Sequence, residues 1–101
     1  MNMQQMMAQA QKMQRDLRKA MEELAKQEFS VSKGGAVTVV MMGDGSLKSV
    51  EIDDDAFEKE NKEMVQDLIV LAIQELSDKI DTAKEDINER ITGSRGGFGG
   101  I

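Results

Sequence analysis

Five basic residues recur along residues 12–26 at spacings that would place them on one side of a helix. They are Lys12, Arg15, Arg18, Lys19 and Lys26. At 100° per residue, three of them fall within about 60° of Lys12, and Arg18 lies about 60° beyond Arg15. A row of cations on an exposed helix can bind the phosphate groups of a nucleic acid, with an affinity that depends on salt more than on base sequence.

The same pattern is also typical of a solvated helix surface, because Asp16, Glu22 and Glu23 lie three or four residues from these cations and can pair with them. Methionine is the second unusual feature, since six of the nine methionines lie within residues 1–21. A Met-rich face can adapt to a partner surface, and it can equally pack in a core or a dimer seam.

The sequence contains few of the residue types that support catalysis. The absence of His and Cys excludes Ser-His-Asp and thiolate catalysis and most zinc sites. The acidic run Asp53–Asp55 lacks the alternating ligands and the closing Glu of a calcium loop. The sequence therefore predicts a protein that is not an enzyme, with no catalytic residue, no metal, no cofactor and no small-molecule substrate.

The net charge of −6 is distributed unevenly, at +2 over residues 1–50 and −8 over residues 51–101. A basic surface can therefore exist on this acidic chain. The first eleven residues are uncharged and interrupted by Asn and Gln, unlike a signal peptide. The longest apolar run has six residues, where a membrane span needs about 20. We expect a cytoplasmic protein with no membrane partner.

Hydrophobic periodicity predicts the elements that must position the cations. Apolar residues between Met3 and Leu24 recur every three or four positions within an arc of about 140°, opposite the cations, which predicts a helix over residues 2–28. Strands are predicted at 29–33, 36–42 and 47–52, separated by glycine turns, and their short connections predict an antiparallel meander. The middle strand is apolar on both faces, so we expect both to be covered.

A short helical turn is expected at residues 56–60, followed by a long helix over 62–91 with Asn61 as its N-cap. Five glycines in residues 92–101 predict a disordered tail. The fold class is therefore α+β: a long helix, a three-stranded antiparallel meander, a short helix and a long helix. Residues 1–91 form the single domain.

The predicted helices are longer than a compact domain of this size is wide, so both should project beyond the sheet. The economical way to cover the apolar sheet is a homodimer with projecting helical arms. The predicted dimer interface comprises Val37, Val39, Met41, Leu68 and Leu71.

Several stretches, in this order and spacing, resemble the YbaB/EbfC family of bacterial nucleoid-associated proteins. They are residues 2–7, 9–14, 22–24, Gly34-Gly35 before Val37 and Val39, Gly43 with Leu47, Val50, Ile52 and Asp53, Gln66–Ile69 with Ala72, and Gly93–Gly100. The resemblance implies a homodimer, often compared to tweezers, that binds DNA in the nucleoid and affects its organisation or transcription.

The resemblance also bears on the predicted DNA-binding residues. The family's basic positions carry over to Lys12 and Arg15, whereas Arg18, Lys19 and Lys26 come from the helical spacing, and Arg90 is included for its place near the arm tip. Family members often have further lysines where this chain has Gln5 and Ala8. An alternative stays open, in which the Met-rich arms clamp a partner protein.

Overall fold

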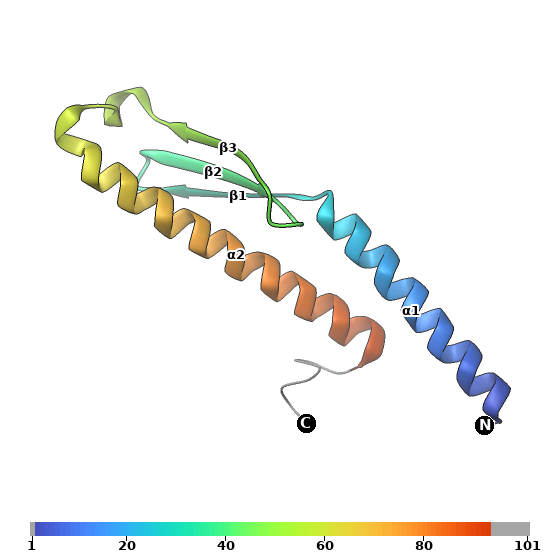
Figure 1. The fold of residues 1–101 in the computed structure, drawn as a ribbon. Helices are drawn as coiled ribbons and strands as arrows, with labels where there is room; N and C mark the ends of the chain where they lie inside the picture. The colour runs from blue at the N-terminus through green and yellow to red at the C-terminus, as the bar shows by residue number, and fades with distance from the viewer. Residues whose placement is uncertain (1, 94–101) are drawn as a thin grey trace.

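Two long helices flank a small antiparallel sheet in the computed structural model, which describes residues 2–93 (Figure 1). The elements are α1 (Met3–Ala25), β1 (Glu28–Lys33), β2 (Val37–Met42), β3 (Leu47–Ile52), the 3-10 turns η1 (Asp54–Ala56) and η2 (Lys59–Asn61), and α2 (Lys62–Thr92). The predicted α+β order is confirmed, with two 3-10 turns in place of one short helix. The predicted glycine-rich tail lies outside the described residues from residue 94 onward.

α1 begins with a capping box. Asn2 Oδ1 accepts a hydrogen bond from the Gln5 backbone N–H at 2.8 Å, and Gln5 Oε1 accepts one from the Asn2 N–H at 3.3 Å. Each bond satisfies an amide group that the first helical turn leaves without a backbone partner. The helix ends at Ala25, before the predicted residue 28, because Glu28 already pairs with Met42 in the sheet.

The three strands form the predicted meander, in the order β1-β2-β3 with both pairs antiparallel. Val39 in the centre lies opposite Val31 on one side and Val50 on the other. The β1–β2 turn passes through Gly34 and Gly35, whose φ angles are +59° and +66°. A tight hairpin turn needs two consecutive positive φ angles, which glycine adopts without strain.

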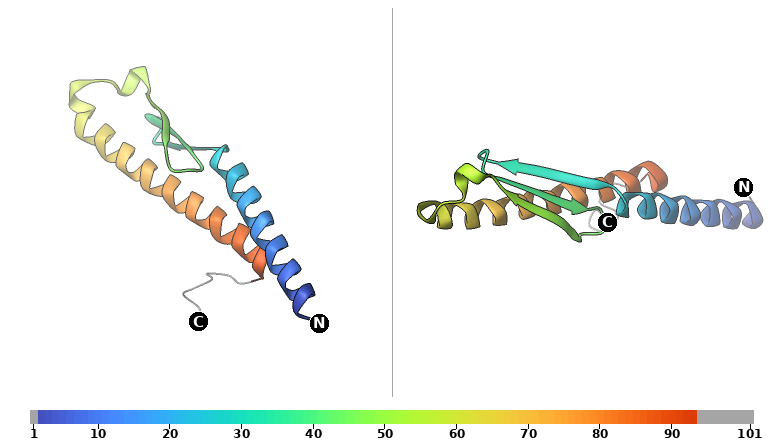
Figure 2. Two further views of the ribbon diagram at one scale, coloured as in Figure 1. Left: turned by 45° about the vertical axis from the view of Figure 1, so that its right-hand side comes forward. Right: turned by 90° about the horizontal axis from the view of Figure 1, so that it is seen from above.

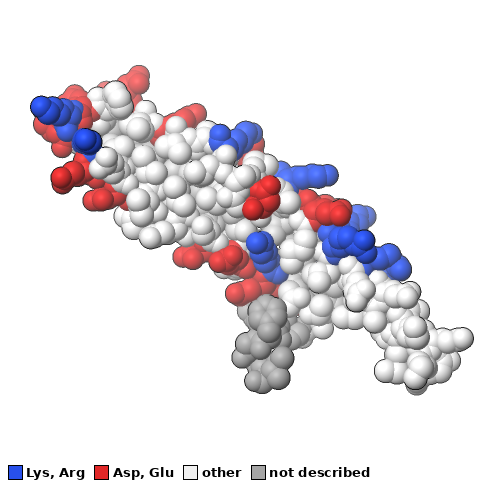
Figure 3. Space-filling model, in the orientation of Figure 1, with Lys and Arg blue, Asp and Glu red and all other residues white. Residues whose placement is uncertain are grey.

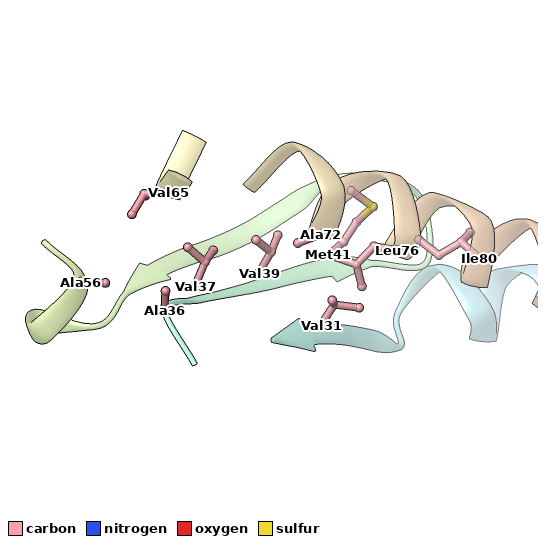
Figure 4. Packing of buried hydrophobic residues seen from close by; sticks show 10 residues of the cluster. All are labelled: Val31, Ala36, Val37, Val39, Met41, Ala56, Val65, Ala72, Leu76 and Ile80. Carbon is pink, nitrogen blue, oxygen red and sulfur yellow. The ribbon is translucent and has the colours of Figure 1, made fainter. Parts of the chain in front are cut away.

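α2 covers one face of the sheet and forms the core with it (Figure 4). Val37 and Val39 are 2% and 0% exposed, and they pack with Ala72 and Leu76 of α2, which are both fully buried. β2 therefore alternates buried and half-buried residues along its length. A single chain thus buries the β1 and β2 part of this face without a second copy.

The other face of β2 departs from the prediction that both faces are covered. Thr38, Val40 and Met42 are only half-buried, and no helix of residues 2–93 packs over them. Val40 lies between Ser30 of β1 and Ser49 of β3 in the strand register. Hydroxyl side chains on both sides let this face meet water, so the apolar residues there do not require a cover.

α2 runs one residue further than predicted and ends at Thr92, where Gly93 adopts a left-handed φ of +74°. α2 begins at Lys62 with Asn61 at the N-cap position, as predicted, but the capping hydrogen bond expected of the Asn61 side chain is not made. Instead, Asn61 Nδ2 donates to the Ala56 carbonyl at 3.2 Å. The side chain thereby ties η2 to η1 rather than capping α2.

The molecule is elongated, with extents of 68 × 26 × 15 Å. Its radius of gyration is 19.1 Å, against about 13 Å for a compact chain of this length. The C-terminal half of α1 packs on α2, with Leu24 buried and Ala20 half-buried, whereas residues 2–12 are all exposed. Both views in Figure 2 show the first turns of α1 continuing past the end of α2. The prediction that the helices project beyond the sheet is confirmed.

Candidate nucleic-acid interface

All five cations predicted on the first helix are exposed. Four lie within α1, and Lys26 is its C-cap residue. Leu24 marks the side of α1 that packs on the fold, and the centre of the cationic arc lies roughly opposite it at 100° per residue. We call this set the basic stripe: Lys12, Arg15, Arg18, Lys19 and Lys26.

One member of the basic stripe has an acidic partner within the same helix. Lys12 Nζ lies 2.9 Å from Asp16 Oδ2, one turn further along. The hydrogen bond from Lys12 lowers the pKa of Asp16, and the positive charges of Lys12, Arg15 and Lys19 lower it further. Asp16 therefore stays ionised and offsets part of the charge of Lys12. Both side chains are largely exposed, so the pair adds little to stability.

Arg90 lies apart from the basic stripe. It lines a hollow of about 280 Å³ between the two helices, together with Glu23, Gln27 and Ile87. Arg90 thus lies beside the hollow between the helices, with its side chain exposed, whereas the basic stripe points away from that hollow. The sequence could not reveal this, because it does not fix how far α2 is rotated about its axis.

α2 presents mainly carboxylates on its outer side. They are Asp67, Glu75, Asp78, Glu85 and Glu89, and all are exposed except Glu75, which is half-buried. Glu75 Oε2 lies 2.9 Å from Lys33 Nζ, and the hydrogen bond from Lys33 lowers the pKa of Glu75. Figure 3 shows blue side chains gathered along α1 and red ones below α2. The two helices therefore differ in the charge that they present to a polyanion.

A second surface is apolar and was missed by the sequence analysis. α2 packs over β1 and β2, which leaves the same face of β3 only partly covered. Beside β3 lies an apolar hollow of about 470 Å³, lined by Ile52, Phe57 and Ile69 among others. We call the exposed apolar residues on this face of β3 and beside the hollow the β3-side surface: Leu47, Val50 and Phe57, which are 52%, 42% and 75% exposed. The signal for this surface that the sequence did offer is Phe57, which is one of only three aromatic residues in the chain.

The five residues predicted at a dimer interface fall into two groups. Val37, Val39 and Met41 are buried within the chain beneath α2. Leu68 is half-buried and Leu71 is 51% exposed, both on the side of α2 that faces β1, where Glu75 meets Lys33. Only these two leucines remain accessible to another chain.

Residues 2–93 hold neither a metal site nor a membrane-spanning helix. In this part of the chain no three acidic side chains converge as a metal site would require. None of the helices described there is long and apolar enough to cross a bilayer.

Comparison with known proteins gives one consistent match. The profile of the YbaB/EbfC DNA-binding family matches residues 1–95. A protein of Saccharopolyspora erythraea named nucleoid-associated protein is 42% identical over 99% of this chain and 87% of its own length. Proteins of the same name from Ruminiclostridium cellulolyticum and Xylella fastidiosa are 38% and 42% identical over 99% and 84% of this chain, and over 88% and 78% of their own lengths.

Proposed function

Because the chain belongs to the YbaB/EbfC DNA-binding family, we propose that it is a nucleoid-associated protein that binds double-stranded DNA through the basic stripe of α1. The observation that carries the proposal is the exposure of five cations on the side of α1 opposite its packed side. A duplex lying along this side meets cations, whereas the outer side of α2 would repel its phosphates.

The contacts are made to phosphates rather than to base edges. Lys and Arg at one-turn spacing along a helix can follow a phosphate backbone, and such contacts position a protein without reading sequence. We therefore expect a modest sequence preference that arises from DNA shape and deformability.

The cations contribute unequally in this proposal. Arg15, Arg18 and Lys19 lie in the middle of the basic stripe and carry most of the affinity. Lys12 contributes less because Asp16 holds it at 2.9 Å. Arg90, beside the hollow between the helices, contributes little.

The functional unit is a homodimer, which presents two basic stripes to DNA. We place its interface on the β3-side surface, because Val50 and Phe57 leave apolar area uncovered beside a hollow lined by Ile52 and Ile69. In a two-fold dimer the same surface of each chain covers the other. The competing interface is the β1-facing side of α2 at Leu71.

The alternative function is protein binding by the Met-rich arm. Met3, Met6 and Met7 are 76%, 57% and 58% exposed, and a solvent-exposed methionine surface can adapt to a partner helix. Such binding would bury apolar area and depend weakly on salt, whereas DNA binding by the basic stripe depends on it strongly.

Fluorescence anisotropy with two labelled duplexes of unrelated sequence tests the proposal. Titrations at salt concentrations from 50 to 200 mM should show affinity falling by about a thousandfold if six or more phosphates are contacted. The two duplexes should give similar values at each salt concentration. Binding that does not weaken with salt, or no binding at 50 mM, would contradict the proposal.

A further inference from the structure

The apolar residues of α1 follow a heptad pattern along the whole helix. Met3, Ala10, Leu17 and Leu24 are seven residues apart, and Met6, Met13 and Ala20 form the second register, three residues after the first. Two apolar positions per heptad define the seam of a coiled coil. α1 thus carries one continuous seam of three heptads.

Within residues 2–93, only the C-terminal part of this seam has a partner. Ala20 and Leu24 face Ala83 and Ile87 of α2 across the hollow between the helices. Burial decreases steadily toward the N-terminus, from Leu24 at 3% exposed through half-buried Leu17 to Met6 at 57% and Met3 at 76%. The seam therefore continues beyond the end of α2 with nothing covering it in the described chain (Figures 1 and 2).

We propose that the uncovered end of this seam, residues 3–10 of α1, packs against the same segment of a second copy of the chain. The segment is called the arm tip. This contact is separate from the β3-side surface and does not depend on DNA binding. It would join arms end to end, so that copies bound along DNA could be linked to one another.

Charge favours a second copy as the occupant. The first eleven residues carry no charged side chain, in a chain whose net charge is −6. The basic stripe and the acidic outer side of α2 each repel their own counterpart in a second copy, whereas two arm tips do not. The lower end of α1 in Figure 3 is accordingly free of blue and red. A seam of Met and Ala is also complementary to itself, because two apolar stripes exclude water from one another.

The geometry leaves DNA binding compatible with this contact. Met6 lies roughly 180° around the helix from Arg15 and 120° from Arg18, so arm tips that pair through Met6 leave the basic stripe facing outward. If the methionines were instead inserted between DNA bases, α1 would have to turn its apolar seam toward the duplex, and the basic stripe would then face away from the DNA.

The capping box shows how the arm tip stays helical before it pairs. The first turn of a projecting helix frays readily, because its amide groups have no backbone partner. The reciprocal bonds between Asn2 and Gln5 satisfy the first amide groups of this segment. Pairing of two tips then adds the tertiary contacts that the segment lacks.

Disulfide cross-linking tests the contact cleanly, because the chain has no native cysteine. Met6→Cys places a thiol on the seam, and Ala8→Cys places one on the opposite side of the same exposed segment as a matched control. At micromolar protein without DNA, Met6→Cys should form inter-chain disulfides at least about tenfold faster, because pairing holds the thiols at a high effective concentration. Adding Met3→Lys to Met6→Cys should abolish this advantage.

Two outcomes would overturn the proposal. The first is equal cross-linking rates for Met6→Cys and Ala8→Cys, which is expected if the seam meets DNA or another protein instead. The second is an advantage for Met6→Cys that Met3→Lys leaves unchanged. Because the assay contains no DNA, either failure leaves the proposed DNA binding intact. Repeating it in a Val50→Asp background should leave the advantage unchanged, and its loss there would show that the arm tips meet only through the β3-side surface.

Discussion

Gly43 packs directly against the carbonyl group of Leu24, where α1 meets the sheet. A Cβ atom at position 43 would lie 1.8 Å from Leu24 O, which is far inside van der Waals contact. The Gly43 N–H also donates a hydrogen bond to the Gln27 carbonyl at 2.9 Å. The turn after β2 thus fixes the point from which the arm projects, and only a residue without a side chain fits there.

Gly43→Ala should therefore destabilise the protein by about 3 kcal/mol, because backbone atoms rather than a flexible side chain must move. Gly35→Ala is the control. It places a Cβ in open space at a φ of +66°, and its cost of about 1 kcal/mol comes from backbone strain alone. Urea unfolding followed by circular dichroism measures both. Equal losses for the two variants would contradict the close contact at the arm junction.

Removing the carboxylate within the basic stripe should strengthen DNA binding. Asp16→Asn releases Lys12 and removes a negative charge from the surface that meets phosphate, so affinity at low salt should rise by about two- to tenfold. Glu63→Gln, an exposed substitution in the first turn of α2, should have no such effect. Anisotropy titrations at 50 mM salt check both variants.

Acidification should not reproduce the gain of Asp16→Asn. The hydrogen bond from Lys12 lowers the pKa of Asp16 from its ordinary value, so the carboxylate stays ionised under mildly acidic conditions. A group whose pKa is lowered in the folded state stabilises that state at higher pH, and its contribution is lost only as the pH falls through the lowered pKa. In the wild type, Asp16 should therefore stay ionised between pH 7 and pH 5, and it should cause no change in DNA binding over this range. A gain over this range that Asp16→Asn abolishes would contradict the pairing.

A charge on the β3-side surface should break the homodimer. Val50→Asp would bury an unpaired carboxylate in the proposed interface and weaken the dimer by about a hundredfold or more. Ser49→Asp is the matched control, because its side chain points to the other face of the same strand. Sedimentation velocity at micromolar protein distinguishes the outcomes.

The same measurement separates the two candidate interfaces. Leu71→Asp should leave the dimer intact if the β3-side surface forms the contact. Dissociation by Leu71→Asp but not by Val50→Asp would move the interface to the β1-facing side of α2. A wild-type protein that sediments as a monomer would refute the dimer itself.

Local patterns in the sequence predicted the elements well. The three-and-four spacing of apolar residues and the absence of Gly and Pro predicted α1 to within three residues at its C-terminal end. The Gly34-Gly35 pair predicted the hairpin, because two positive φ angles suit a tight turn and little else. The exposure of the five stripe cations followed from the same periodicity.

What the sequence did not predict depends on how elements pack together. The sequence of β2 is apolar on both faces, yet α2 covers only the face that carries Val37, Val39 and Met41. The opposite face is left open to water, where the hydroxyl groups of the neighbouring strands lie beside Val40. Arg90 was placed with the basic stripe because both lie on the arms, but the rotation of α2 puts it beside the hollow between the helices. Neither feature can be predicted from the spacing of residues within a single segment.

The salt dependence of DNA binding by charge-removal variants tests the central claim most directly. Arg15→Gln/Lys19→Gln removes two cations of the basic stripe, and Lys79→Gln/Lys84→Gln removes two exposed cations of α2 as the matched control. Each lost phosphate contact should flatten the slope of log K against log salt by about 0.9, so the stripe variant should lose about 1.8, or about 3.6 if both copies in a dimer touch DNA. The control should keep the wild-type slope, and both variants should keep the wild-type thermal unfolding. An unchanged slope for Arg15→Gln/Lys19→Gln, or an equal loss in Lys79→Gln/Lys84→Gln, would contradict binding through the basic stripe of α1.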